Sequence, residues 1–293
     1  MSSLPASIRG GLWMMASALS FTIMTALIRD VAKEIHPFEI GIFRVVTNLL
    51  LMLPFVLRTG RAIWVSDNHK VYVFRGLIGS AFLLCYFPGA ALIPVSDAQA
   101  LIFTTPLFAA LMAVVFLKEK VRARRVTALI VGFLGALIIL RPGFAHINIG
   151  SVLVLLSAVF FAASLVTVRH TTRTDHPDTA VFYLMLYMTP LVGIPALFVW
   201  TTPTWSQVGL MVLIGFFATL NQRFFSRAFA TAETMAVLPY DFSRLPFAAI
   251  IGWMAFSELP DVWVWTGGTV IFGASLYIAH REMVAGRDGS KQD

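Results

Sequence analysis

Four charged residues lie inside long apolar stretches of this chain. They are Arg44, Arg223, Asp241 and Arg244. A charge in hydrocarbon costs at least about 2.5 kcal/mol, so such residues normally face the interior of a helix bundle or a wet cavity. The chemistry we expect of them is therefore non-covalent: holding the charged groups of a solute, or holding one another.

Asp241 and Arg244 are three residues apart, which places them on one face of a helix where they can pair. Arg223 belongs to the preceding apolar stretch, at a depth that would let it join them. Two interpretations stay open, a substrate-binding or gating network and a structural pair that fixes helix register. Arg44 has no partner close in sequence, which makes it the better candidate for contact with a carboxylate.

Uncharged polar and aromatic residues in the same stretches extend this set. Thr105 precedes Pro106. Proline has no N–H, so a main-chain carbonyl in the preceding turn lacks its helical hydrogen bond, and the Thr105 hydroxyl is close to it. Gln222 next to Arg223 belongs to the densest polar run in any apolar stretch, which favours a pathway along that segment. The candidate pathway residues are Arg44, Asn48, Tyr86, Phe103, Thr105, Gln222, Arg223, Tyr240, Asp241, Phe242 and Arg244.

The motifs of catalysis and cofactor binding are missing from the sequence. It contains no phosphate-binding glycine loop, no paired-histidine metal spacing and no nucleophile elbow. The single cysteine, Cys85, excludes an internal disulfide and a multi-cysteine metal site. We therefore expect no enzyme activity, no cofactor, no metal and no use of ATP by this chain.

The composition is that of an integral membrane protein. Of 293 residues, 58% are hydrophobic and 13% charged, and the mean hydropathy is +0.81. A net charge of +7 does not indicate nucleic-acid binding, because the basic residues lie in short segments between apolar spans. The pattern predicts an all-α protein with ten transmembrane helices near 10–29, 38–57, 71–91, 97–117, 125–141, 149–168, 179–200, 207–229, 235–256 and 262–280.

The distribution of Lys and Arg predicts the orientation. Sixteen of them, Arg75 included, are assigned to one side of the membrane and three to the other. Under the positive-inside rule, both termini lie in the cytoplasm.

The sequence also contains an internal repeat. Residues 10–37 match 150–177 at an offset of 140, and the FAA at 108–110 recurs at 247–249. Glu119 and Glu258 correspond at an offset of 139 and are expected to cap or tether the next helix, with a gate role left open. The chain thus divides into two five-helix repeats, 1–143 and 144–293. Because five is odd, the second repeat crosses the membrane inverted, a plan shared by many secondary transporters.

Three segments resemble the drug/metabolite transporter superfamily of the EamA type. They are ALIFTTPLFAALMAVVFLKEKV at 100–121, GFLGALIILRPG at 132–143 and LPYDFSRLPFAAIIGWMAFSELPD at 238–261. Within the superfamily, the chain is most similar to YddG-type bacterial exporters of aromatic and other amino acids. The resemblance implies an inner-membrane location, a central cavity lined by helices of both repeats, and secondary, often proton-linked transport.

These observations favour an exporter of amino acids that works by alternating access. Arg44 or Arg244 would meet the substrate carboxylate, and Asp241 the ammonium or a coupling proton. The partners are then the lipid bilayer and a small molecule, and a monomer is sufficient. Aromatic walls and hydrogen bonds would come from Tyr86, Phe103, Tyr240, Phe242, Thr105 and Gln222.

The alternative is an importer of a larger metabolite such as S-adenosylmethionine. A membrane-embedded enzyme or flippase lacks a catalytic constellation. The inverted repeat and the intramembrane charges argue against a purely structural protein.

Overall fold

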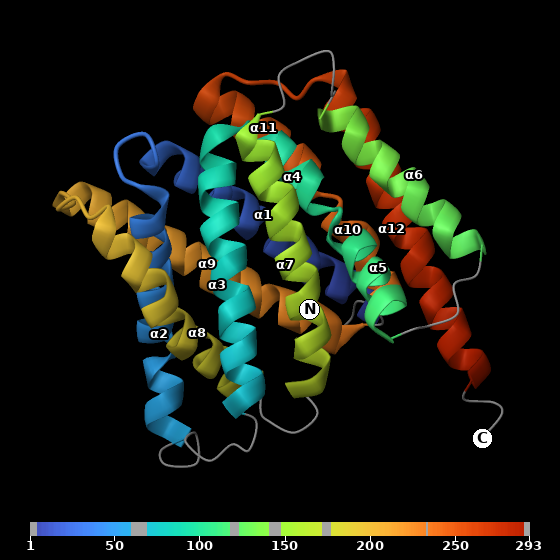
Figure 1. Ribbon diagram of the computed structural model, residues 1–293, viewed down its shortest axis with the longest axis horizontal. Helices are drawn as coiled ribbons and strands as arrows, with labels where there is room; N and C mark the ends of the chain where they lie inside the picture. The colour runs from blue at the N-terminus through green and yellow to red at the C-terminus, as the bar shows by residue number, and fades with distance from the viewer. Residues whose placement is uncertain are drawn as a thin grey trace.

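In the computed structural model, residues 5–59, 69–117, 123–140, 148–171, 177–232 and 234–289 are described, and their secondary structure is entirely helical. Figure 1 shows the helices as one bundle. In chain order they are α1 (Ala6–Val31), α2 (Pro37–Thr59), α3 (His69–Leu92), α4 (Val95–Ile102), α5 (Thr105–Leu117), α6 (Ala123–Leu140), α7 (Ile149–Thr171), α8 (Pro177–Phe198), α9 (Trp205–Thr231), α10 (Thr234–Asp241), α11 (Arg244–Phe256) and α12 (Val262–Gly289).

The outer surface of the bundle is that of a membrane protein. Large apolar side chains are left uncovered along the helices, including Leu57 at 73%, Phe198 at 85% and Trp205 at 91% exposure. Five described helices are long and apolar enough to cross a membrane, namely α1, α2, α3, α8 and α9, and shorter apolar segments lie at 127–140 and 149–164. The all-helical membrane fold is thus confirmed, while the number of ten spans stays a prediction.

Two of the predicted helices are broken. The segments 97–117 and 235–256 were expected to be continuous, but each consists of two short helices, α4 with α5 and α10 with α11. At the first break Pro106 has no N–H for the Ile102 carbonyl, which instead accepts a hydrogen bond of 2.7 Å from the Thr105 hydroxyl. The two breaks are 139 residues apart, the same offset as the sequence repeat.

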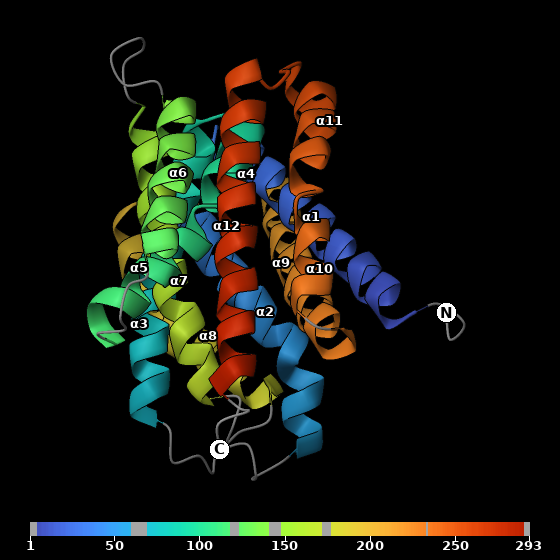
Figure 2. The ribbon, with the colours of Figure 1, turned by 90° about the vertical axis from the view of Figure 1, so that its right-hand side faces the viewer.

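The bundle is built from pairs of helices distant in sequence. α1 packs along α9, α3 along α7, α2 along α8, and α6 along α12. Figure 2 shows α12 running the length of the bundle beside α6. Glycines allow the closest approach, since a Cβ added to Gly267 would lie 2.6 Å from the carbonyl oxygen of Gly135.

The bundle has an upper and a lower end as drawn in Figure 1. At the upper end α1 and α11 finish and α4 begins; at the lower end α2 and α5 finish and α3 and α10 begin (Figure 1). The predicted boundary between the repeats, at residues 143 and 144, lies outside the described residues.

Candidate functional site

Asp241 and Arg244 form an ion pair across the break between α10 and α11. The Arg244 Nε donates to the Asp241 Oδ1 at 2.7 Å, and both side chains are largely buried. The guanidinium also lies over the ring of Phe21 of α1, 4.8 Å from its centroid. The predicted pairing is therefore present. Because Asp241 already compensates Arg244, this cation is less available to a substrate than an unpaired one.

A buried polar network joins α1, α3 and α4 next to this pair. The hydroxyls of Thr25 and Tyr86 lie 2.8 Å apart, and the Gln99 amide donates to Thr25 at 3.0 Å. All three residues are fully buried, and the Tyr86 ring packs between Phe21 and Phe82. The predicted aromatic wall at Tyr86 is thus part of the packed interior, and sequence reasoning did not single out Thr25 or Phe21 as its partners.

The two helix breaks meet through an aromatic cluster. Phe103 and Phe242, which are 139 residues apart, stack with their ring centroids 5.9 Å apart. Phe272 of α12 completes the cluster, 4.4 Å from Phe242 and 5.8 Å from Phe103. The neighbouring Thr105 is 4% exposed, and its hydroxyl is used within the break. These residues fix the breaks against each other.

Arg44 and Asn48 are one helical turn apart on α2, and each has a buried polar atom that no described residue contacts by a hydrogen bond. The Nε of Arg44 and the Oδ1 of Asn48 are buried, and neither accepts or donates a hydrogen bond within the described part of the chain. Asn48 is 1% exposed. Unlike Arg244, Arg44 has no carboxylate beside it among the described residues. A donor and an acceptor held unsatisfied in the interior are suited to a polar ligand.

The candidates near the end of α9 are not brought to the ion pair. We expected Arg223 to join Asp241 and Arg244, but its side chain is exposed and makes no recorded contact with them among the described residues. Gln222 is half-buried, and its recorded hydrogen bond runs from the Ser226 hydroxyl to its main-chain carbonyl. Tyr240 packs its ring against Gly11 of α1. On α9 the helical rotation leaves Arg223 exposed, which the sequence run alone did not reveal.

Arg75 is an interior charged residue that the sequence did not bring into the candidate set. It lies within the predicted span 71–91 and inside α3, is 5% exposed, and has its Nε and Nη1 without hydrogen-bond partners in the described structure. The sequence analysis used it only as a basic residue at one side of the membrane.

The upper end is closed by a second ion pair. The Nη1 and Nη2 of Arg29 on α1 donate to the two oxygens of the Glu258 carboxylate, the Nη2 at 2.7 Å. The guanidinium also lies 4.6 Å from the ring centroid of Phe256. Glu258 therefore tethers the segment after α11 to α1. Its counterpart Glu119 lies outside the described residues.

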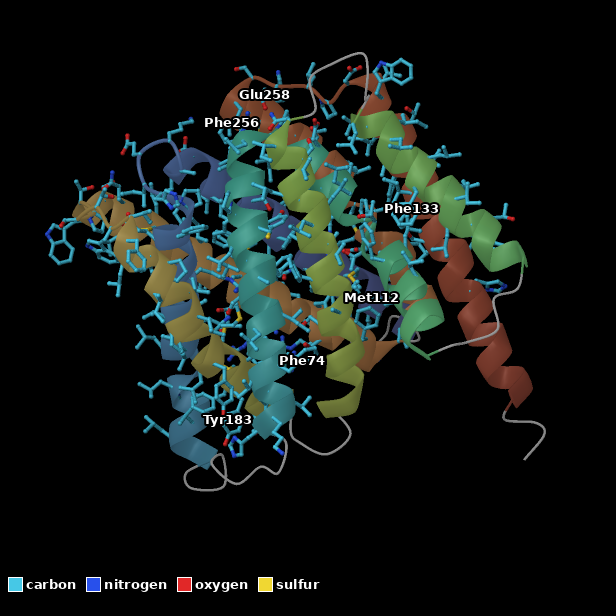
Figure 3. All side chains as sticks on the ribbon, viewed as in Figure 1. Phe74, Met112, Phe133, Tyr183, Phe256 and Glu258 are labelled. Atoms are coloured by element: carbon cyan, nitrogen blue, oxygen red, sulfur yellow. The ribbon has the colours of Figure 1, made fainter. Side chains whose placement is uncertain are left out.

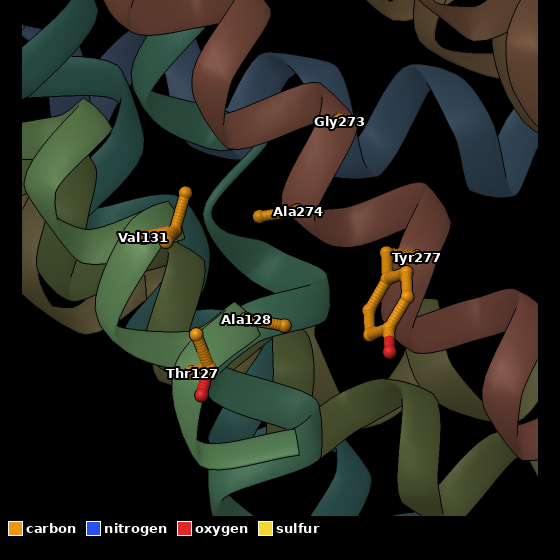
Figure 4. Close-up of a pocket in the computed structure, with 6 residues that line it drawn as sticks. All are labelled: Thr127, Ala128, Val131, Gly273, Ala274 and Tyr277. Carbon is orange, nitrogen blue, oxygen red and sulfur yellow. The ribbon is translucent and has the colours of Figure 1, made fainter. Parts of the chain in front are cut away.

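A surface groove of about 370 Å³ lies elsewhere, between α6 and α12 (Figure 4). Its lining is mostly small and apolar and contains none of the charged candidates. Among the described residues, no group of three or more His, Cys, Asp or Glu could hold a metal ion.

Comparison with known proteins identifies the class. Residues 8–141 match the model of the EamA-like transporter family. The chain is 30% identical over 277 residues to a riboflavin transporter of Rhizobium johnstonii, covering 94% of this chain and 92% of that one. It is 31% identical to the pseudopaline exporter CntI of Pseudomonas aeruginosa, covering 92% and 95%. The chain belongs to the EamA-like transporter family and is a multi-pass membrane protein.

Other similarities agree on the fold and differ in substrate. An S-adenosylmethionine uptake transporter of Rickettsia bellii is 28% identical, with coverage of 93% and 94%. One solved crystal structure aligns with a TM-score of 0.62 at 17% identity, covering 93% of this chain and 96% of that one. None of the three relatives named here carries the name of an amino-acid exporter, so the family is established and the substrate is not.

Proposed function

We propose that this protein is a secondary transporter that exports amino acids across the bacterial inner membrane by alternating access. The observation that carries the proposal is the buried Nε of Arg44, one turn from the buried Oδ1 of Asn48, both without a hydrogen-bond partner among the described residues. A carboxylate would satisfy the first and an ammonium the second. An amino acid carries both groups on neighbouring atoms.

The contrast between Arg44 and Arg244 supports this assignment. A cation inside the membrane is stabilised by an opposite charge, and Arg244 already has Asp241 at 2.7 Å. Arg44 has no carboxylate beside it among the described residues, and a bound anionic group would supply that compensation. A coupling proton, which the family resemblance implies, would have to compete with Arg244 for the Asp241 carboxylate.

Alternating access is supported by an asymmetry in packing. At the upper end α4 packs against α11, and Glu258 holds α1. The counterparts at the lower end, α5 and α10, are not among the closely packed pairs of the described structure. In an inverted repeat, the missing contacts would form when the upper ones separate. The proposal includes two repeats, 1–143 and 144–293, ten spans and cytoplasmic termini.

A second candidate comes from the relatives. Proteins named for S-adenosylmethionine uptake and for riboflavin transport cover nearly the whole chain. The alternative function is uptake of such a larger metabolite. A cationic substrate would, however, meet an uncompensated guanidinium at Arg44 and a carboxylate at Asp241 that is already engaged.

Counterflow in proteoliposomes tests the proposal. Vesicles holding the purified chain and unlabelled amino acids would be offered labelled phenylalanine, threonine and methionine, with vesicles preloaded with S-adenosylmethionine or riboflavin assayed in parallel. We expect protein-dependent amino-acid uptake that falls at least about tenfold in Arg44→Gln, the cost of one charge-assisted contact. Arg227→Gln, which removes an exposed arginine on α9, is the matched control. Uptake of S-adenosylmethionine or riboflavin alone would establish the second candidate instead.

A further inference from the structure

The groove between α6 and α12 lies on the outer surface of the bundle. The inner face of α12 is occupied, since Phe272 stacks on Phe242 with ring centroids 4.4 Å apart. On the groove side Val131 of α6 and Tyr277 of α12 are exposed. No described atom lies within 4 Å of a Cβ added to Gly273, so the groove is open there. In a bilayer, an apolar surface of this kind meets acyl chains instead of water.

Toward the upper end, the groove is closed by contact between the two backbones. A Cβ added to Gly135 of α6 would lie 2.9 Å from the carbonyl oxygen of Gly267 of α12, and the converse distance is 2.6 Å. The groove lining at Val131 and Gly273 lies on the other side of this contact, toward the start of α6 and the end of α12 (Figure 4). The space is therefore bounded above and extends toward the lower end of the bundle.

Arginines follow the groove on both helices. Arg124 of α6 is three residues before Thr127, and Arg281 of α12 is four residues after Tyr277. Thr127 and Tyr277 both line the groove. Residues three or four apart lie on the same face of a helix, one turn from each other. Positions 124 and 281, with Arg125 next to the first, therefore continue the groove at its lower end.

The acidic residues of these helices lie elsewhere. α6 contains none in its sequence. On α12, Glu282 is five residues after Tyr277, which turns it about 140° around the helix, and Asp288 is about 16 Å further along the axis. The sequence before α6, KEKVR at 118–122, has three basic residues and one acidic one. Positive charge therefore predominates at this end of α6 and α12.

The length of the groove region matches one leaflet of a bilayer. From Arg124 to Gly135, α6 rises about 16 Å, which is about half of a hydrocarbon core of roughly 30 Å. The oxygen atoms of Thr127 and Tyr277 lie at the end of the groove away from Val131 (Figure 4). Tyrosine is enriched where acyl chains meet headgroups. A lipid chain that ends near the glycine contact would thus have its headgroup at the level of the arginines.

We propose that this groove binds one anionic phospholipid of the leaflet at the lower end. Its acyl chain lies against Val131 and Gly273, and its phosphate lies among Arg124, Arg125 and Arg281. A guanidinium binds a phosphate through two parallel donors, and basic sites between transmembrane helices select anionic headgroups. The bound lipid would join α6 and α12 below the point where their backbones touch. The inference is independent of the substrate proposed above.

Lipid binding to the purified full chain in detergent tests the headgroup site. Native mass spectrometry would compare dioleoyl phosphatidylglycerol with dioleoyl phosphatidylcholine, which have the same acyl chains. We expect the first phosphatidylglycerol to bind at least about tenfold more tightly, and the combined variant Arg124→Gln, Arg125→Gln and Arg281→Gln to reduce this preference below about threefold. Arg227→Gln, on α9, should leave the preference unchanged. Phosphatidylglycerol should also raise the thermal unfolding temperature, whereas inorganic phosphate should not.

A second variant tests the apolar part of the site. Gly273→Leu places a side chain in the groove without a clash, because no described atom lies within 4 Å of the added Cβ. It should weaken phosphatidylglycerol binding at least about tenfold and leave the unfolding temperature in detergent alone no lower. Gly209→Leu, at an equally open position on α9, is the matched control and should bind the lipid as the unaltered protein does.

Three results would overturn the proposal. Equal affinity for the two lipids, or a preference that survives in the combined arginine variant, would exclude the headgroup site. Equal effects of Gly273→Leu and Gly209→Leu would exclude the groove as the place where the acyl chain lies. A dimer in detergent that Gly273→Leu separates would assign the groove to a second copy of this chain instead of a lipid.

Discussion

At the upper end of the bundle, Arg29 binds both oxygens of Glu258, while Thr25, Tyr86 and Gln99 form a buried hydrogen-bonded network nearby. At the lower end the recorded polar contacts lie nearer the surface, as in the pairing of His69 with Tyr187. Figure 3 shows Glu258 at the first of these ends and Tyr183 at the other. Among the described residues, the contacts at the upper end are a partly buried ion pair and a buried network, whereas the contact of His69 with Tyr187 at the lower end is exposed. In the proposed transport cycle, contacts at the two ends need not exist at the same time.

The largest effect should come from the ion pair where α10 meets α11. Asp241→Ala leaves Arg244 buried and uncompensated, and breaking a buried pair in this way costs about 3–5 kcal/mol. We expect a corresponding loss in the free energy of unfolding, measured by denaturant titration in detergent. The double variant Asp241→Ala with Arg244→Leu no longer contains the uncompensated charge, so it should recover most of the lost free energy of unfolding. If the double variant is as unstable as the single one, the pair does not hold the break together.

A smaller loss in the free energy of unfolding is expected from a substitution where two helices touch through their backbones at the upper end. A Cβ on Gly150 of α7 would lie 2.9 Å from the Gly89 carbonyl oxygen, and backbone cannot move aside as a side chain can. Gly150→Ala should therefore lower the unfolding free energy by about 1–3 kcal/mol. Gly209→Ala on α9 is the control, because nothing lies within 4 Å of its added Cβ. Equal stabilities of the two variants would show that the upper end is not packed this closely.

Charge reversal tests the ion pair at the upper end directly. Arg29→Glu or Glu258→Arg alone should slow counterflow by about tenfold, or about 1.4 kcal/mol, because like charges then face each other when that end closes. The double exchange should return transport to within about threefold, since it recreates the pair in the opposite order. If counterflow by the double variant is no faster than by either single variant, the pair is not a gating contact.

The smallest expected difference separates a buried hydroxyl from an exposed one. Tyr86→Phe removes the group that shares a hydrogen bond with Thr25 in the fully buried network, at a cost of about 1 kcal/mol. Tyr187→Phe removes a hydroxyl whose contact with His69 is exposed, and should cost less than about 0.5 kcal/mol. Thermal unfolding of both variants in the same detergent gives the comparison. A larger loss of stability in Tyr187→Phe than in Tyr86→Phe would contradict the expectation that the buried hydroxyl contributes more.

Sequence reasoning succeeded where the signal is a sum over many residues. Apolar stretches predicted an all-helical membrane protein, and three segments predicted the transporter family; both are confirmed. It also located the pairing of Asp241 with Arg244, because a separation of three residues on a helix is a local constraint.

Sequence reasoning failed where the answer depends on which face of a helix turns inward. Arg223 follows Gln222 in a polar run, yet one residue of rotation is about 100° and leaves Arg223 exposed. Arg75 entered only the count of basic residues at one side of the membrane, and its burial within α3 was not predicted. The helix breaks were missed for a related reason: Pro106 marks a kink, but whether the chain kinks or stops depends on the hydroxyls that take up the freed carbonyl.

From the sequence alone it therefore follows that the protein is helical, lies in a membrane and resembles one transporter family. Hydropathy and the internal sequence match can be read without the structure, because they are properties of the chain. The tertiary structure decided which charges are compensated. Arg244 has its carboxylate three residues away, but Arg29 is compensated by Glu258, 229 residues along the chain, only through the packing of the helices, and among the described residues the same packing brings no carboxylate to Arg44. Compensation depends on distances of a few ångströms between segments far apart in sequence, and no local pattern encodes those distances.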